Sequence, residues 1–326
     1  MSGVIVSGAT GFLGGAVVRH LLQERVPVIA LGRNRAKLDE AQQAGATILR
    51  RDISQDVLLP AGLQADCFIH CAALSSPWGR RAEFEAANID GTRNALSLAR
   101  QAGASRFIFI SSPSVYFRFA DQDLVPEDTP LPPPVNAYAE TKVAAEQLVQ
   151  SAEDMHSVIL RPRGLYGPGD TALLPRLLRA ARRGPLPLMR DGVAATDLTF
   201  INDVAEAVRA AMSAAGPSGR VYNVSGGEAL SVRRVAEAAG ERAGIAVRWR
   251  SLPWGAVRAA TQASEFVSRL RPGQPEPRVT AYSAGLFAFR QTLDISRIRA
   301  ELGWAPKVSF AEGLERTFAG GDLAAA

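Results

Sequence analysis

The chain has 326 residues, of which 47% are hydrophobic and 21% charged, and its formal net charge is +5 at pH 7. These values exclude a disordered chain and predict a globular protein with a large core. The basic residues are scattered, apart from one run at Arg176, Arg179, Arg182 and Arg183. Nucleic-acid binding gathers basic side chains on one face. We therefore expect no nucleic-acid partner and only a mild attraction for anionic ligands.

The two cysteines, Cys67 and Cys71, lie four residues apart in a predicted buried strand. Without zinc-ligand neighbours, they fit reduced structural thiols better than a disulfide framework or a metal site. The chain runs from Met1 directly into an apolar strand with no charged leader, and no apolar run approaches the length of a membrane span. The sequence thus predicts a cytoplasmic protein without a metal or a membrane partner.

Short apolar runs alternate with helical stretches through the first half of the chain. We predict strands at 4–7, 26–31, 46–51, 67–71 and 106–110, and helices at 14–24, 36–44 and 82–102. The strands are continuously apolar, as in a sheet whose two faces are both covered by helices. The βαβα order predicts an α/β fold with a doubly wound parallel sheet.

The pattern stops at 117–134, where the prolines exclude a helix or a central strand and predict a long functional loop. A helix then begins at the N-cap Asn136 and reaches about residue 151, before a strand at 158–161. The second half is less regular: we predict helices at 173–183 and 203–215, a strand at 196–201, and breaks at Pro253 and 271–277. Since no linker separates the halves, we expect them to interleave.

A glycine-rich segment, Gly8-Ala9-Thr10-Gly11-Phe12-Leu13-Gly14, connects the first strand to the first helix. Glycines in this turn let backbone N–H groups approach a pyrophosphate at the positive end of the helix. In a βαβ context the motif predicts a dinucleotide site, with a ligand-free turn as the alternative. The second strand ends in Arg33-Asn34-Arg35, with no carboxylate before Asp39. Because guanidinium groups suit a 2′-phosphate, this favours NADP, with NAD as the alternative.

Tyr138 and Lys142 lie four residues apart on one predicted helix and therefore share a face. An ammonium near the phenol, together with a positive nicotinamide ring, would lower the tyrosine pKa. Ser112 follows a strand end and could donate to a substrate oxygen. These three residues together predict a proton-transfer site, although the Tyr-x-x-x-Lys spacing alone is weak.

Several motifs in one order resemble the extended short-chain dehydrogenase/reductases, the NAD-dependent epimerase/dehydratase superfamily. They are Gly8-x-x-Gly11-x-x-Gly14, His70-Cys71-Ala72-Ala73, Asn88-Ile89-Asp90-Gly91-Thr92, Ser111-Ser112-Pro113-Ser114-Val115-Tyr116, Tyr138-x-x-x-Lys142, Arg161-Pro162-Arg163, Phe200-Ile201-Asn202-Asp203-Val204-Ala205, Tyr222-Asn223-Val224 and Leu302-Gly303-Trp304-x-Pro306.

The resemblance implies that Tyr138 is the general acid/base, that Lys142 holds the nicotinamide ribose and that Ser112 polarises the substrate oxygen. It implies a structural role for Asn88. The cofactor contacts it implies are Gly8, Thr10, Gly11, Phe12, Leu13, Gly14, Arg33, Asp52, Ile53, Cys71, Ala72, Ala73, Ile110, Lys142, Pro162 and Arg163.

Departures from the family's sugar-modifying members narrow the function. Pro113 and Ser114 stand where the 4,6-dehydratases have an Asp-Glu pair, and Thr196 stands where UDP-sugar epimerases commonly have a diphosphate-binding arginine. What remains resembles the 3β-hydroxysteroid dehydrogenase and 2-alkyl-3-oxoacid reductase branch. We expect an NAD(P)-dependent oxidoreductase that acts on a ketone or secondary alcohol of a largely apolar substrate, 3-oxoacid or steroid-like. The alternatives are a sugar or nucleotide-sugar epimerase and a non-enzymatic dinucleotide sensor.

The resemblance also implies how the chain is divided and how it associates. Residues 1–165 with about 196–225 would form the Rossmann domain, and about 166–195 with 226–326 a smaller, interleaved C-terminal substrate-binding domain. Helices 82–102 and 137–151 would pair into a homodimer. The substrate pocket would draw on Pro113, Phe117, Phe119, Tyr166, Leu173, Leu174 and Trp254.

Overall fold

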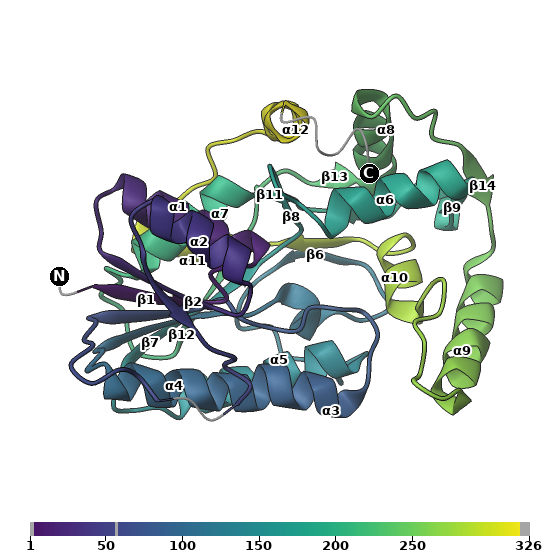
Figure 1. Ribbon diagram of the computed structural model, residues 1–326. Coiled ribbons are helices and arrows are strands. Elements are labelled where there is room, and N and C mark those ends of the chain that lie inside the picture. Colours follow the sequence, from purple (N-terminus) through teal and green to yellow (C-terminus); the bar gives the residue numbers. More distant parts are fainter. Residues whose placement is uncertain (1–2, 56–57, 320–326) are drawn as a thin grey trace.

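The computed structural model describes residues 3–55 and 58–319. The predicted domains begin at residue 1 and end at residue 326, and both of these ends lie outside the described ranges. A parallel seven-stranded sheet of order β12-β7-β5-β4-β1-β2-β3 forms its centre (Figure 1). The strand order reverses between β1 and β4, and ligands bind α/β sheets at the carboxyl edge beside such a point. The strands are β1 Val4–Ser7, β2 Val28–Gly32, β3 Thr47–Arg50, β4 Cys67–His70, β5 Arg106–Ile110, β7 His156–Pro162 and β12 Arg220–Val224.

Helices cover both faces of this sheet, because alternate residues of each apolar strand point to opposite sides. In β1, Val4 and Val6 pack with one helical layer while Ile5 packs with the other. The doubly wound Rossmann fold predicted from the sequence is therefore confirmed. The first layer holds α1 Phe12–Gln23, α2 Arg35–Gln43, α7 Ile201–Ala211 and α11 Ser296–Leu302; the second holds α4 Gly91–Gln101 and α5 Ala137–Gln150 (Figure 1).

The predicted helix at 82–102 is helical over its length but not uniformly so. It comprises α3 Arg81–Phe84, a π-helical turn at Glu85–Asp90 and α4. Within the π turn, Asn88 accepts from Leu74 N (2.8 Å) and donates to Thr141 Oγ1 (3.0 Å). Asn88 thus fastens the loop after β4 to helix α5, which agrees with the structural role expected for it.

A second, four-stranded sheet has the order β13-β10-β15-β6. Its strand β6 lies inside residues 117–134, where the prolines predict a loop; the strand forms there because it ends before the first of them, Pro126, and pairs with β15 at the sheet edge. The predicted strand at 196–201 is in fact two strands in two sheets, β10 and β11, and Ile201 already begins α7. The strands outside the large sheet are β6 Gln122–Val125, β8 Leu165–Tyr166, β9 Leu186–Leu188, β10 Ala195–Thr196, β11 Thr199–Phe200, β13 Leu230–Ser231, β14 Trp249–Ser251 and β15 Gln291–Leu293.

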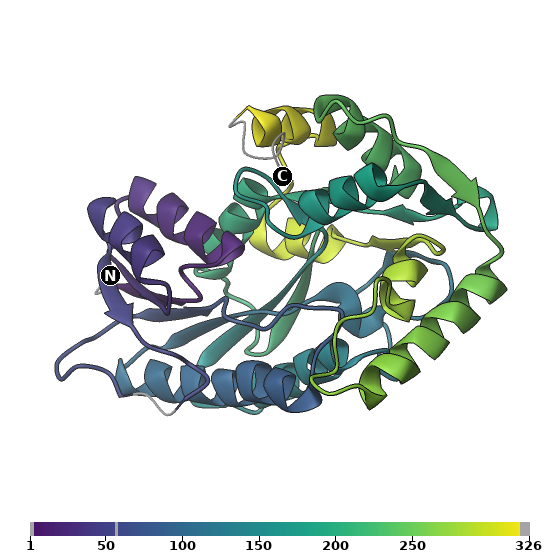
Figure 2. The same ribbon diagram turned by 45° about the vertical axis from the view of Figure 1, so that its right-hand side comes forward.

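The remaining helices lie beyond the large sheet, with α9 along one margin of the molecule (Figure 2). In α6 the arginine run lies on the exposed side, while Leu174 and Leu178 are buried. Within the described ranges, no helix is both long and apolar enough to cross a membrane. These helices are α6 Leu173–Arg183, α8 Val232–Arg242, α9 Trp254–Leu270, α10 Ala281–Leu286 and α12 Phe310–Phe318.

Candidate active site

The glycine-rich turn after β1 is packed too tightly for side chains. A Cβ on Gly8 would lie 2.6 Å from Ala72 N, and one on Gly14 would lie 2.1 Å from Gly8 O. Gly8 also has φ +69°, a left-handed conformation that favours glycine. Helix α1 begins directly after Gly11 with no side-chain cap, so its first N–H groups point at the turn unpaired. This geometry fits the pyrophosphate of a dinucleotide.

The far end of the turn meets the second strand. Gly32 ends β2 against the Thr10 side chain, since a Cβ there would lie 2.7 Å from Thr10 Cγ2. The next residue, Arg33, is exposed and reaches Asp52 at 3.2 Å, while Arg35 pairs with Asp39 within its own helix. Partial burial raises the pKa of Asp52, but hydrogen bonds from Ser54 and the Arg33 pair outweigh it and lower that pKa.

Other residues expected at the cofactor also lie at this edge of the sheet. Cys71, Ala72 and Ala73 follow β4, Ile110 ends β5 and Pro162 ends β7. Ile53 is different, because its side chain is buried in the core beside α4. The side chain of the preceding residue, Asp52, is 29% exposed.

The predicted catalytic residues come together from two elements. Asn136 caps α5 by accepting from Ala139 N (2.8 Å), which places Tyr138 in the first turn and Lys142 one turn later. Ser112 follows β5, where its hydroxyl accepts from Ser114 N (3.2 Å). Burial raises the pKa of the Tyr138 phenol, and the Ser112 and Ser75 side chains at the hydroxyl offset only part of that rise. The sequence predicts that an ammonium and the nicotinamide ring of a bound cofactor lower this pKa; before a cofactor binds, desolvation of the phenolate dominates.

Lys142 is buried, and its Nζ donates to Ile110 O at 2.7 Å and lies 4.2 Å from the Phe109 ring centre. Desolvation lowers the pKa of Lys142 to about 8, although Glu146 acts to raise it. The Glu146 carboxylate is itself held by Arg161, with Nε at 2.8 Å and Nη2 at 2.5 Å. A backbone carbonyl and an aromatic ring therefore hold the lysine ammonium, one helical turn after Tyr138.

Two groups near the site carry no sequence signal. Ser75 lies in the loop after β4, and Tyr282 lies in α10, which the sequence does not predict. Tyr282 packs edge-on against Phe117 at 4.9 Å between ring centres. Burial raises the pKa of Tyr282, the Arg163 charge acts to lower it and the Tyr138 charge to raise it. Neither Ser75 nor Tyr282 belongs to a motif with a fixed spacing, so the sequence alone could not identify them.

An aromatic cluster extends from Tyr282 away from the catalytic residues. Its ring-to-ring contacts join Phe117, Phe119, Trp254, Phe289 and Tyr282. Two other residues expected in the pocket, Tyr166 and Leu174, lie instead in a separate core cluster with Phe200 and Phe310. They are core residues because α6, α8 and α12 pack around them.

Comparisons with known proteins agree with this geometry. The NAD dependent epimerase/dehydratase family matches residues 4–225. A 2-alkyl-3-oxoalkanoate reductase of Stenotrophomonas maltophilia is 32% identical over 96% of this chain and 97% of its own length. The 4-hydroxy-2-methyl-3-oxo-4-farnesyl-3,4-dihydroquinoline-1-oxide ketoreductase of Stigmatella aurantiaca is 31% identical, over 95% and 94%.

A sterol-4-alpha-carboxylate 3-dehydrogenase of Saccharomyces cerevisiae is 29% identical over 78% of this chain and 76% of its own length. Among solved structures, MoeE5 in complex with UDP-glucuronic acid and NAD matches with a TM-score of 0.73 and 25% identity, covering 97% of each chain. The chain is therefore similar both to proteins named as reductases or dehydrogenases and to a protein whose structure contains a nucleotide sugar and NAD.

Proposed function

Because the chain belongs to the NAD-dependent epimerase/dehydratase family and is an NAD(P)-dependent oxidoreductase, we propose that it interconverts a ketone and a secondary alcohol in a 3-oxoacid with an apolar tail. The observation that carries the proposal is the position of Tyr138. Its hydroxyl meets Ser112 and Ser75, its charge acts on Tyr282 of the aromatic cluster, and Lys142 lies one helical turn away. We infer that the polar reacting group lies at Tyr138 and the apolar tail along the aromatic cluster.

The names of the relatives support this substrate class. The Stenotrophomonas protein is named for a 2-alkyl-3-oxoalkanoate, and the yeast protein for a sterol that carries a carboxylate next to the carbon it oxidises. The Stigmatella protein is named for a farnesyl ketone. Large apolar groups recur in these substrates, as the aromatic cluster of this chain would require.

The proposed mechanism assigns a task to each residue. The bound dinucleotide supplies the hydride for the carbonyl carbon. As that bond forms, the Tyr138 hydroxyl donates its proton to the carbonyl oxygen, which Ser112 also contacts by hydrogen bonding. The phenol can act as the proton donor because it is protonated at neutral pH: the ordinary pKa of tyrosine is 10.0 and burial raises that of Tyr138. The Lys142 cation stabilises the phenolate that remains.

We also propose that the cofactor is NADP rather than NAD. Arg33 is exposed at the end of β2, and its guanidinium is held toward the cofactor edge by Asp52. We expect Arg33→Asp to shift the ratio of NADP to NAD affinity by at least about tenfold toward NAD, because a charge-assisted phosphate contact is lost. Calorimetric titration of both cofactors measures this ratio. Arg35→Asp is the matched control, since Arg35 is engaged by Asp39; a wild type that prefers NAD contradicts the proposal.

The domain division, the oligomeric state and the location that the sequence predicts are further parts of this proposal. The Rossmann part would be 1–165 with about 196–225, and the substrate part about 166–195 with 226–326. We propose a homodimer through α4 and α5, which sedimentation would test. A cytoplasmic location is supported by Cys67 and Cys71, which are both free thiols.

The test of the proposed function is a substrate panel followed at 340 nm with NADPH and NADH. We expect oxidation of the cofactor by long-chain 3-oxoacids. UDP-glucose and UDP-galactose should show neither turnover nor thermal stabilisation, because Thr196 replaces the usual diphosphate-binding arginine. Epimerisation of a UDP-sugar without net cofactor oxidation would instead support the epimerase alternative.

A further inference from the structure

Arg163 is a buried cation beside the proposed active site. It follows the last residue of β7 and is 7% exposed. Its Nε donates to Thr196 Oγ1 at 3.0 Å, and its Nη1 donates to Gln291 Oε1. Both acceptors are neutral and belong to the four-stranded sheet, so the side chain points from the cofactor edge toward the substrate part.

Among the residues that the structure describes, no carboxylate contacts this guanidinium. Asp197 is close enough to act on the Arg163 charge, but its carboxylate accepts from Leu293 N at 2.7 Å, and no ion pair joins the two. In residues 3–55 and 58–319, Nη2 of Arg163 meets no hydrogen-bond acceptor. Burial accordingly lowers the pKa of Arg163.

Arg161, two residues earlier on β7, shows the contrast. It is buried to a similar degree, and Glu146 binds it through two nitrogens. Buried charges are costly unless they are paired. Arg161 is thus neutralised by a carboxylate of the protein, whereas Nη2 of Arg163 remains free to donate.

We propose that Arg163 forms a subsite for the carboxylate of the substrate, and so selects 3-oxoacids over uncharged ketones. This proposal rests on the proposed function. In a 3-oxoacid a single carbon atom separates the carbonyl carbon from the carboxylate. With the carbonyl at Tyr138 and the alkyl tail along the aromatic cluster, the carboxylate would lie toward Arg163, since the charges of Arg163 and Tyr138 both act on Tyr282. The free Nη2 of the guanidinium can bind it through a charge-assisted hydrogen bond.

The experiment compares a long-chain 3-oxoacid with its methyl ester, which has the same ketone and no charge. The readout is the ratio of the two kcat/KM values with NADPH, because any effect on cofactor binding changes both rates alike and cancels. We expect the wild type to favour the acid by about tenfold or more. Arg163→Met should abolish this preference.

Gln291→Glu is the second variant, and it keeps the arginine. The new carboxylate would pair with Nη1 and occupy the cation, so the preference for the acid should fall by a similar factor. The matched control is Arg290→Gln, which removes an adjacent cation that already pairs with Asp123 at 2.8 Å. That change should leave the ratio unaltered.

Calorimetric titration of the acid and ester into the protein–NADP complex gives a readout that does not depend on turnover. If the wild type reduces neither compound, the proposed function fails, and the affinities alone decide the role of Arg163. Equal kcat/KM values for acid and ester in the wild type, or an unchanged ratio in both variants, would overturn the proposed carboxylate subsite. Binding of a UDP-sugar that is lost in Arg163→Met overturns it in favour of a diphosphate.

Discussion

Tyr138 and Lys142 share a helical face, but burial acts on their protons in opposite ways. It raises the pKa of the phenol and lowers that of the ammonium, so each neutral form is favoured. The residue types and their spacing could be predicted from the sequence. The direction of the Tyr138 shift could not, because it depends on how deeply the whole fold encloses the hydroxyl.

The lowered pKa of Lys142 makes a prediction about stability. Between pH 8 and pH 10.5 the unfolded chain holds a proton on Lys142 that the folded protein has lost, so stability rises with pH in this window. Below pH 8 the folded protein bears the full free-energy cost of burying the charged ammonium. We expect Lys142→Met to raise the unfolding free energy of the cofactor-free protein by about 2 kcal/mol at pH 7. Chemical denaturation should show the gain shrinking as the pH rises to 10.5.

The control for this prediction is Lys37→Met, since Lys37 is half exposed and pairs with Glu40 in the same helix. Its effect on stability should be small and similar at both pH values. A gain in Lys142→Met that does not change with pH would contradict the view that the cost arises from burying the charge.

Helix α1 and its glycine turn show what a motif can predict at the scale of elements. The order strand, glycines, helix gives the position of the dinucleotide turn because only glycine fits where two backbones nearly touch. By contrast, β6 and the split of 196–201 into β10 and β11 could not be predicted. These short strands exist through pairing with β15 and β8, which are remote in sequence.

The turn can be tested with two neighbouring glycines. In Gly14→Ala the new methyl would lie 2.1 Å from Gly8 O, so the turn must move; we expect a loss of about 1–3 kcal/mol and of cofactor binding. In Gly15→Ala the nearest atoms are 3.4 Å away, and the helix should be unchanged or up to about 1 kcal/mol more stable. Thermal unfolding and cofactor titration measure both variants; equal behaviour of the pair would contradict this account.

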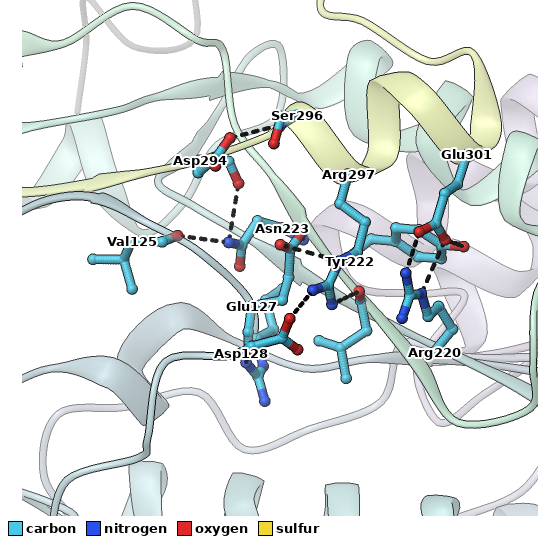
Figure 3. A network of polar contacts seen from close by, with 12 residues as sticks. Val125, Glu127, Asp128, Arg220, Tyr222, Asn223, Asp294, Ser296, Arg297 and Glu301 are labelled. Carbon is cyan, nitrogen blue, oxygen red and sulfur yellow. Dashed lines mark hydrogen bonds and ion pairs between the residues drawn. The ribbon is translucent and has the colours of Figure 1, made fainter.

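The whole molecule is held together by polar contacts between segments far apart in the chain. Asn223 on β12 donates its backbone N–H to Glu127 and its side-chain amide to Val125 O and Asp294 O, at 2.9–3.1 Å (Figure 3). Its amide oxygen accepts from Tyr116. The motif around Asn223 was recognised in the sequence, but its role was not, because its partners lie in the long loop and before α11.

We therefore expect Asn223→Ala to lower the unfolding free energy by roughly 3 kcal/mol, since the Tyr116 hydroxyl and the carbonyls of Val125 and Asp294 each lose a hydrogen bond. Arg290→Ala is the control, because the Arg290–Asp123 pair bridges the same two segments but is about half exposed. Its cost should stay within about 1 kcal/mol. Urea denaturation of both variants would reveal the difference, and equal costs would argue against a buried network.

The central claim is that Tyr138 protonates a substrate ketone while hydride is transferred from the cofactor. The most direct measurement uses NADPH with deuterium at the transferable position and a long-chain 3-oxoacid. The wild type should give a 3-hydroxyacid with one deuterium at the former carbonyl carbon, and Tyr138→Phe should form it at least about a hundredfold more slowly with unchanged cofactor affinity. Absence of deuterium from that carbon, or a near-normal rate in Tyr138→Phe, would contradict the account.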